Sequence, residues 1–171
     1  MATYTSTNAT ARTPISLVRS IGIAGLVIGT VGGFDYVTFF ALTQHFTPEG
    51  MFQYIASGLL GSAAFTGGFA TALLGLLIHF VISFVVAAVF ILAASQIAFL
   101  RRTVFASAMV FGAAVNMFMS ALVLPLSAAP KMPVTTLLVV HGLIGDAIFV
   151  GLPLAIIVWR DARVQKASLA A

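Results

Sequence analysis

The chain has 171 residues, of which only 7% are charged, against about 25% in an ordinary soluble domain. Apolar residues make up 61% and the mean hydropathy is +1.14, which is more apolar surface than a soluble fold of this size can bury. These values exclude a soluble enzyme, a disordered chain and a nucleic-acid-binding domain. The net charge of +4 comes from basic residues in separate segments, so there is no basic patch for nucleic acid. The absence of cysteine excludes disulfides and thiolate metal sites.

Four long apolar stretches follow a polar segment at residues 1–13, which we expect to be a mobile cytoplasmic tail. A membrane-spanning helix needs about 20 residues, and each stretch reaches that length. The first stretch is too long for a signal peptide and no small-residue cleavage site closes it, so we interpret it as a retained span. The pattern predicts an all-α, polytopic membrane protein with four transmembrane helices. The expected spans are 14–42, 69–100, 103–126 and 134–159, in a single domain of residues 14–163 with a short C-terminal tail at 164–171.

The segment between the first two expected spans begins with Thr47, Pro48 and Glu49, which is typical of a helix start. The apolar run after it is broken by Gly and Ser and is only about 15 residues long, marginal for a span. We expect an extra interfacial helix at about 48–65 on the outer side of the membrane, anchored by Phe52 and Tyr54. A segment that enters the membrane is the alternative.

The basic residues predict the orientation of the four-span arrangement, because cytoplasmic loops of membrane proteins carry an excess of Lys and Arg. Seven of the eight fall on one side and Lys131 alone falls on the other. Both termini are therefore expected in the cytoplasm, with Trp159 at the inner interface. The seven residues are Arg12, Arg19, Arg101, Arg102, Arg160, Arg163 and Lys166.

Each expected span brings a polar side chain to the outer half of the membrane, where such residues are costly and are candidates for function. At 1.5 Å per helical residue, Asp35 lies about 24 Å from Arg19 along the first span. Asn116 and Asp146 lie about 21 Å from the nearest arginines of the third and fourth spans. His141 lies at about 28 Å and His79 at about 33 Å, so similar depths are expected for all five.

Small residues share faces with these polar groups and allow helices to approach closely. Gly75, His79 and Ser83 recur at four-residue spacing on the second span, and Gly112, Asn116 and Ser120 do so on the third. Each stripe is expected to face the bundle interior. His141 and Asp146 are about 140° apart around the fourth span, so both cannot point at the axis. The predicted polar cluster comprises Asp35, His79, Ser83, Asn116, Ser120, His141 and Asp146.

A carboxylate near the middle of a bilayer must be paired or neutralised. We expect Asp146 to pair with His79, while Asn116, Ser83 and Ser120 act as hydrogen-bonding contacts between helices. Pro153 removes a hydrogen bond from the fourth span and is expected to kink its inner end. Packing without any function is the alternative for every one of these groups.

A ridge of Gly25, Gly29 and Gly33 on the first span is expected to pack against another helix. That helix belongs either to the same bundle or to a second copy of the chain. The ridge therefore allows a homo-oligomer as well as packing within the chain.

The stretch from His79 to Val86, together with Arg101-Arg102, Pro125 and the run from Arg160 to Arg163, resembles the YagU-type small bacterial inner-membrane proteins. The resemblance covers roughly residues 72–163. Members of that family carry a polar, often His-bearing, fourth helix, where this chain has Asp146 nearest and His141 earlier. The resemblance implies a bacterial inner membrane and a role in envelope stress, not a reaction.

Three functions from different classes are consistent with this pattern. The first is a protonation-linked membrane protein that responds to external pH or stress, with no enzymatic activity, no catalytic residues and no metal or cofactor. The second is a redox protein that holds b-type haem between His79 and His141 as axial ligands. The third is a structural or assembly subunit. The lipid bilayer is the expected partner in all three.

Overall fold

The computed structural model describes residues 14–170, and the expected tail at 1–13 lies outside this range. Helices account for nearly all of the described chain, which contains no strand. Four of them are long and apolar enough to cross a membrane: Ser16–Gln44, Gly68–Gln96, Val104–Leu126 and Thr136–Val164. The fold is an all-α polytopic bundle, as the composition predicts.

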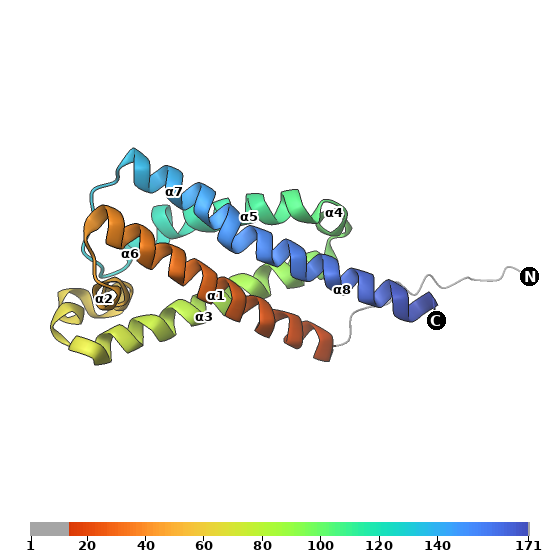
Figure 1. The fold of residues 1–171 in the computed structure, drawn as a ribbon, viewed down its shortest axis with the longest axis horizontal. Coiled ribbons are helices and arrows are strands. Elements are labelled where there is room, and N and C mark those ends of the chain that lie inside the picture. The colour runs from red at the N-terminus through yellow and green to blue at the C-terminus, as the bar shows by residue number, and fades with distance from the viewer. Residues whose placement is uncertain (1–13, 171) are drawn as a thin grey trace, which may run out of the picture.

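The four long helices run along one axis and short elements close its two ends (Figure 1). The first two long helices are α1 (Pro14–Gln44) and α3 (Gly68–Gln96), with α2 (Pro48–Leu60) and the 3-10 turn η1 (Gly61–Thr66) between them. The short helix α4 (Ala98–Arg102) joins α3 to the third long helix. That helix consists of α5 (Val104–Phe118), the π-helical turn η2 (Met119–Val123) and α6 (Leu124–Leu126). The fourth consists of α7 (Thr136–Asp146), the π-helical turn η3 (Ala147–Gly151) and α8 (Leu152–Ala170).

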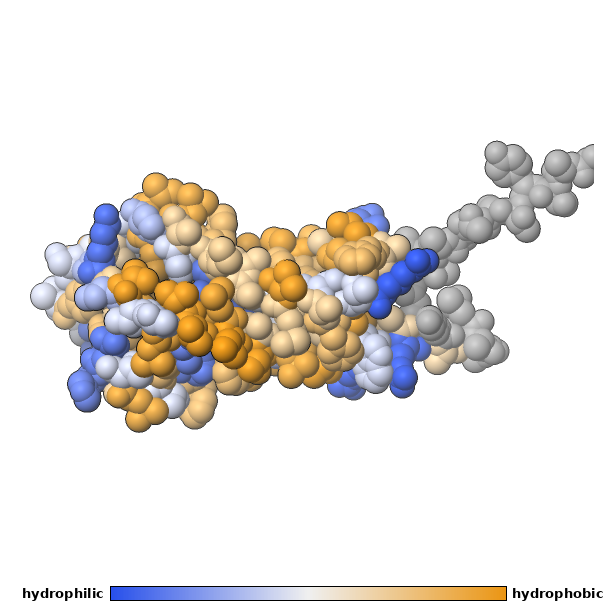
Figure 2. Space-filling view, turned by 90° about the horizontal axis from the view of Figure 1, so that it is seen from above, coloured by the Kyte–Doolittle hydropathy of each residue, from blue (hydrophilic) through white to orange (hydrophobic). Residues whose placement is uncertain are grey.

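The two ends of the bundle differ in charge. One end holds α4 with Arg101 and Arg102, and also the beginning of α1 and the end of α8 (Figure 1). The other end holds α2 and the loop that carries Lys131. Hydrophilic residues gather at both ends and a hydrophobic belt lies between them (Figure 2). We name the end with α4 the arginine end and the end with α2 the α2 end.

The apolar core lies toward the arginine end. It is built from small, branched and aromatic side chains of α1, α3, α5 and α8, among them Ala24, Phe90, Ala108 and Leu154. The third long helix, Val104–Leu126, buries few residues and exposes many large apolar side chains, among them Val110, Met117 and Leu126. Lipid is therefore the natural solvent of the belt, since water would leave these side chains unfavourably hydrated.

The segment expected as an interfacial helix is helical, as α2 and η1, and its place at a membrane interface stays a prediction. Thr47 caps it by accepting a hydrogen bond from Gly50 N at 3.0 Å, and Pro48 occupies the first turn. Phe52 and Tyr54, expected as anchors at the outer interface, are half-buried: the Phe52 ring lies beside His79, and Tyr54 Oη donates to Pro130 O at 3.3 Å. Burial raises the pKa of the Tyr54 phenol, which keeps it protonated as a donor.

The helix boundaries differ from the expected spans in two places. The second span does not reach residue 100, because the helix ends at Gln96 and Ile97 takes an extended conformation before α4 begins. Arg101 Nη1 then donates to the carbonyls of Ser95, at 2.6 Å, and Ala94, at 3.3 Å, which satisfies the end of α3. In the fourth span, α8 continues past residue 159 through the expected tail to Ala170.

Two π-helical turns each end two residues before a proline, at Pro125 and at Pro153. A proline inside a helix has no N–H, and its ring collides with the carbonyl four residues earlier, so the turn before it widens. The widened turn before Pro153 is Ala147–Gly151, directly after Asp146 on the side of the arginine end.

The glycine ridge of α1 packs within the bundle. A Cβ atom at Gly25 or Gly29 would lie within 3 Å of the Phe84 or Phe80 ring of α3, and one at Gly33 would lie 3.1 Å from His79 Nε2. This face of α1 is therefore occupied by α3. A homo-oligomer stays a prediction and would need another surface.

Candidate functional site

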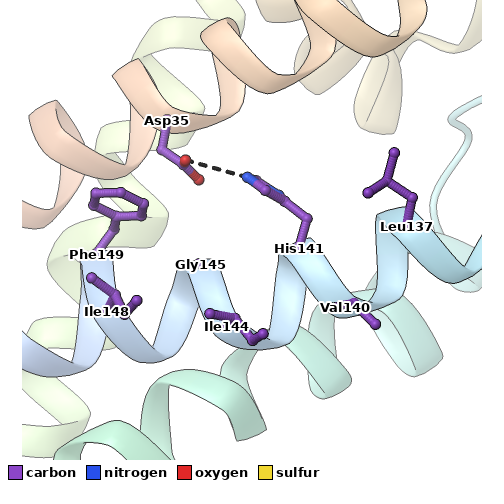
Figure 3. Close-up of a pocket in the computed structure, with 8 residues that line it drawn as sticks. All are labelled: Asp35, Leu137, Val140, His141, Ile144, Gly145, Ile148 and Phe149. Carbon is purple, nitrogen blue, oxygen red and sulfur yellow. Dashed lines mark hydrogen bonds and ion pairs between the residues drawn. The ribbon is translucent and has the colours of Figure 1, made fainter.

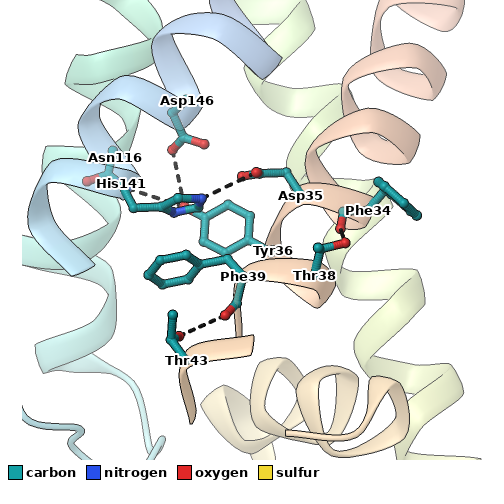
Figure 4. A network of polar contacts seen from close by, with 9 residues as sticks. All are labelled: Phe34, Asp35, Tyr36, Thr38, Phe39, Thr43, Asn116, His141 and Asp146. Carbon is teal, nitrogen blue, oxygen red and sulfur yellow. Dashed lines mark hydrogen bonds and ion pairs between the residues drawn. The ribbon is translucent and has the colours of Figure 1, made fainter. Parts of the chain in front are cut away.

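Two neighbouring residues of α1, Asp35 and Tyr36, form the centre of a polar cluster. They are about 100° apart around the helix, so their side chains reach different partners. Asp35 Oδ1 lies 3.3 Å from His141 Nε2 of α7 (Figure 3). Tyr36 Oη donates to Asp146 Oδ2, also of α7, at 3.4 Å (Figure 4). One turn of α1 thus holds both ionisable side chains of α7.

The third helix joins the cluster through Asn116 of α5. Its Nδ2 donates to Tyr36 Oη at 3.2 Å, so the phenol accepts from α5 and donates to α7. The result is a hydrogen-bonded chain across three helices, Asn116 to Tyr36 to Asp146, beside the Asp35–His141 pair (Figure 4). We use the term α1–α7 cluster for Asp35, Tyr36, Asn116, His141 and Asp146.

Glycines allow the helices to come this close. A Cβ at Gly112 of α5 would lie 2.2 Å from the backbone oxygen of Asp146, and one at Gly142 would lie 2.4 Å from Asn116 Nδ2. A Cβ at Gly145 would lie 3.3 Å from Asp35 Oδ2. The small-residue stripe that includes Gly112 and Asn116 therefore faces the bundle interior, as expected.

Stacked rings hold the imidazole of His141 in place. The Phe39 ring lies parallel to it with centroids 3.6 Å apart, and the Tyr36 ring meets its edge at 6.3 Å. His141 Nδ1 is buried and has no hydrogen-bond partner among the described residues. The imidazole is therefore fixed by ring contacts and by its contact with Asp35 through Nε2.

The Asp35–His141 pair is accessible from the side of the bundle. It lines a shallow groove of about 330 Å³ whose other walls are apolar residues of α7 and η3, including Ile144 and Phe149 (Figure 3). The side chains of His141 and Asp35 are 20% and 14% exposed, whereas Asp146 is buried at 6%. The cluster therefore has an accessible half and an enclosed half, connected through neighbouring residues of α1.

The predicted pairing of His79 with Asp146 is wrong. His79 Nε2 lies 2.9 Å from the carbonyl oxygen of Gly29, whereas Asp146 bonds to Tyr36. His79 faces the bundle interior, as its stripe predicts, and Ser83 Oγ donates to the His79 carbonyl at 2.8 Å. The pairing fails because His79 packs on the Gly29 face of α1, and Tyr36 projects toward α5 and α7.

Ser120 also lies outside the cluster. Its side chain is exposed, although the four-residue spacing from Asn116 predicts the same face. Ser120 lies in the π-helical turn Met119–Val123, which contains no buried residue.

The geometry does not favour His79 and His141 as paired haem ligands. Their Nε2 atoms are directed at Gly29 O and Asp35 Oδ1, groups on different sides of α1. That helix stands between the two imidazoles, in the place where a porphyrin would have to lie. Over residues 14–170, no group of three or more His, Asp or Glu side chains is arranged to hold a metal ion.

Tyr36 is the member of the cluster that the sequence reasoning missed. Its position could have indicated a role: Tyr36 follows Asp35 directly in the first span, at a depth similar to that of Asn116 and Asp146. Aromatic side chains are common in membrane spans, and only the hydroxyl distinguishes this one from the neighbouring phenylalanines.

Comparison with known proteins adds no family to this description. No protein-family model matches the chain, and neither the curated proteins nor the solved structures give a match.

Proposed function

We propose that this chain is a non-enzymatic protein of a bacterial inner membrane whose α1–α7 cluster gains and loses a proton, so that helix packing responds to pH. The observation that carries the proposal is that consecutive residues of α1, Asp35 and Tyr36, hold His141 and Asp146 of α7 together. A change of charge at one pair acts on the same turn of α1 that positions the other.

The chemistry of the cluster supports this function. Charged groups at membrane depth are stable only when they are paired, hydrogen-bonded or neutralised by a proton. The cluster holds two carboxylates, one imidazole and one phenol, and the facing side chain of α5, Asn116, does not titrate. Histidine is the side chain whose charge changes most readily between about pH 5 and 8. A proton therefore changes the balance between attraction and repulsion among Asp35, His141 and Asp146.

The π-helical turn η3 is the element that we expect to respond. It begins directly after Asp146, and π-bulges are frequent at functional sites because their hydrogen bonding is already altered. The second such turn, η2, begins three residues after Asn116. Both helices that contact Tyr36 thus have a deformable turn beside their polar side chain, which supports a change in packing without unfolding.

The distribution of basic residues supports an orientation in which the arginine end faces the cytoplasm. The α1–α7 cluster then lies in the outer half of the membrane and exchanges protons with the external side. This arrangement, with the resemblance to YagU-type proteins, favours a role in sensing acid or stress at the envelope.

The pH dependence of thermal unfolding of the full chain in detergent tests this proposal. Between about pH 5 and 8 we expect the melting temperature of the wild type to change, because the cluster titrates there. Asp35→Asn removes the carboxylate that faces His141, so we expect it to remove at least half of that change. Glu49→Gln is the matched control, since it removes a carboxylate from α2 and should leave the pH profile as it is. If the melting temperature of the wild type did not depend on pH, or if Asp35→Asn had the same pH profile as the wild type, a structural or assembly subunit would be favoured instead.

A further inference from the structure

A second site lies at the opposite end of the bundle, in a cleft of about 290 Å³ between α4, α5 and α8. Two arginines from different helices, Arg101 and Arg163, line it together with the indole of Trp159. The rest of its wall is apolar, formed by Val104, Val158 and Ala162. The cleft thus combines a cationic rim with an apolar floor, and no carboxylate lines it.

Both guanidinium groups are held in position by contacts that leave donors available. Arg101 uses Nη1 to bind the carbonyls of Ala94 and Ser95, and its remaining N–H groups are not used there. The Arg163 Cζ atom lies 4.2 Å from the centroid of the Trp159 ring. Stacking engages the face of that guanidinium, so its N–H groups remain directed outward in the plane. The nearest acid along α8, Asp161, instead accepts a hydrogen bond from Ser20 of α1 at 2.6 Å.

We propose that this cleft binds the phosphate-bearing headgroup of an anionic phospholipid. Arginine binds phosphate through paired N–H groups, and basic pockets between transmembrane helices bind anionic headgroups. Trp159 and the arginine end of the bundle lie where a membrane–water interface places such a headgroup. The volume of the cleft lies at the lower limit of small-molecule sites, which is about 300–1,000 Å³. The cleft is therefore large enough for a headgroup, and the acyl chains of the lipid would lie outside it along the hydrophobic belt.

The apolar floor distinguishes a lipid from a soluble phosphate. Val104 and Val158, which line the cleft, are only 7% and 2% exposed. A free phosphate gains nothing from these surfaces, whereas the glycerol and first methylenes of a lipid are removed from water by them. The lipid is therefore the occupant that uses both parts of the cleft.

Trp159 is the only tryptophan of the chain and lines the cleft, so its fluorescence reports this site alone. The full chain is reconstituted into vesicles of fixed phosphatidylcholine and phosphatidylglycerol content, with bromine on the acyl chains of one lipid or of the other. We expect stronger quenching of Trp159 when phosphatidylglycerol carries the bromine. In Arg101→Gln/Arg163→Gln the relative affinity for phosphatidylglycerol should fall at least about tenfold, because charge-assisted hydrogen bonds to the phosphate are lost.

Arg102→Gln/Arg160→Gln is the matched control, since it removes the same charge from the same helices at residues that do not line the cleft. It should keep the preference. Equal quenching by both brominated lipids in the wild type would overturn the proposal. An equal loss of the preference for phosphatidylglycerol in the two double variants would overturn it as well. Abolition of the preference by millimolar inorganic phosphate would assign the cleft to a soluble anion and overturn it too. Arg163→Gln alone leaves the contacts of Arg101 with α3 intact and repeats the test if the double variant unfolds.

Discussion

Gly112→Ala is expected to lower the free energy of unfolding by about 1–3 kcal/mol, the usual cost of overpacking a close contact. The added Cβ would lie 2.2 Å from the backbone oxygen of Asp146 and 3.0 Å from Ala147 Cα. Backbone atoms cannot rotate away as a side chain can, so α5 must separate from α7. Thermal or denaturant unfolding in detergent, read by circular dichroism, measures the difference.

Gly32→Ala is the control for this prediction. A Cβ at Gly32 meets no atom within 4 Å, and alanine is a better helix former than glycine by about 0.5–1 kcal/mol. We therefore expect the control to be neutral or stabilising. Equal destabilisation by both substitutions would show that α5 and α7 do not approach each other at Gly112.

Tyr36→Phe is expected to cost about 1–3 kcal/mol, because it removes the hydroxyl that accepts from Asn116 and donates to the buried Asp146. In a double-mutant cycle with Asp146→Asn, the coupling should be about 0.5–3 kcal/mol, as for residues in contact. Unfolding free energies of the wild type, the two single variants and the double variant provide this value.

Ser83→Ala supplies the control cycle with Tyr36→Phe. Ser83 bonds to the His79 carbonyl and lies with His79 on the glycine face of α1, so it shares no partner with Tyr36. Its effect should add to that of Tyr36→Phe within about 0.3–0.5 kcal/mol. If the effects in the Tyr36/Asp146 cycle were also additive, the phenol and the carboxylate would not interact. The proposed connection between α1 and α7 through Tyr36 would then be wrong.

The parts of the fold that depend on length and composition could be predicted from the sequence. The four apolar stretches and the start of α2 at Pro48 required only the thickness of a bilayer and the chemistry of a helix cap. Depth was predictable as well, because the rise per residue is constant. Asp35 and His141 were placed at similar depths, and they are hydrogen-bonded in the structure.

The rotation of each helix about its axis could not be predicted in the same way. One sequence does not say which side of α1 faces which neighbour, so His79 was paired with Asp146 instead of Gly29. The spacing of a stripe also does not say how far along a helix the neighbouring helices extend: Ser120 is exposed, in the π-helical turn Met119–Val123, which contains no buried residue. Pro125 was the visible signal for that turn, because a proline widens the helix on its N-terminal side.

The infrared difference spectrum of the full chain, recorded as the pH is stepped between about 5 and 8, tests proton exchange by the α1–α7 cluster most directly. The carbonyl stretch of a protonated carboxyl group is separate from that of a carboxylate, so uptake of a proton by Asp35 or Asp146 is observed at the bond itself. We expect a carboxyl band that titrates in the wild type, that shifts in Tyr36→Phe because Asp146 loses the hydrogen bond from Tyr36, and that disappears in Asp35→Asn/Asp146→Asn. A spectrum without any titrating carboxyl band, or with one that persists in the double variant, would contradict the proposed function.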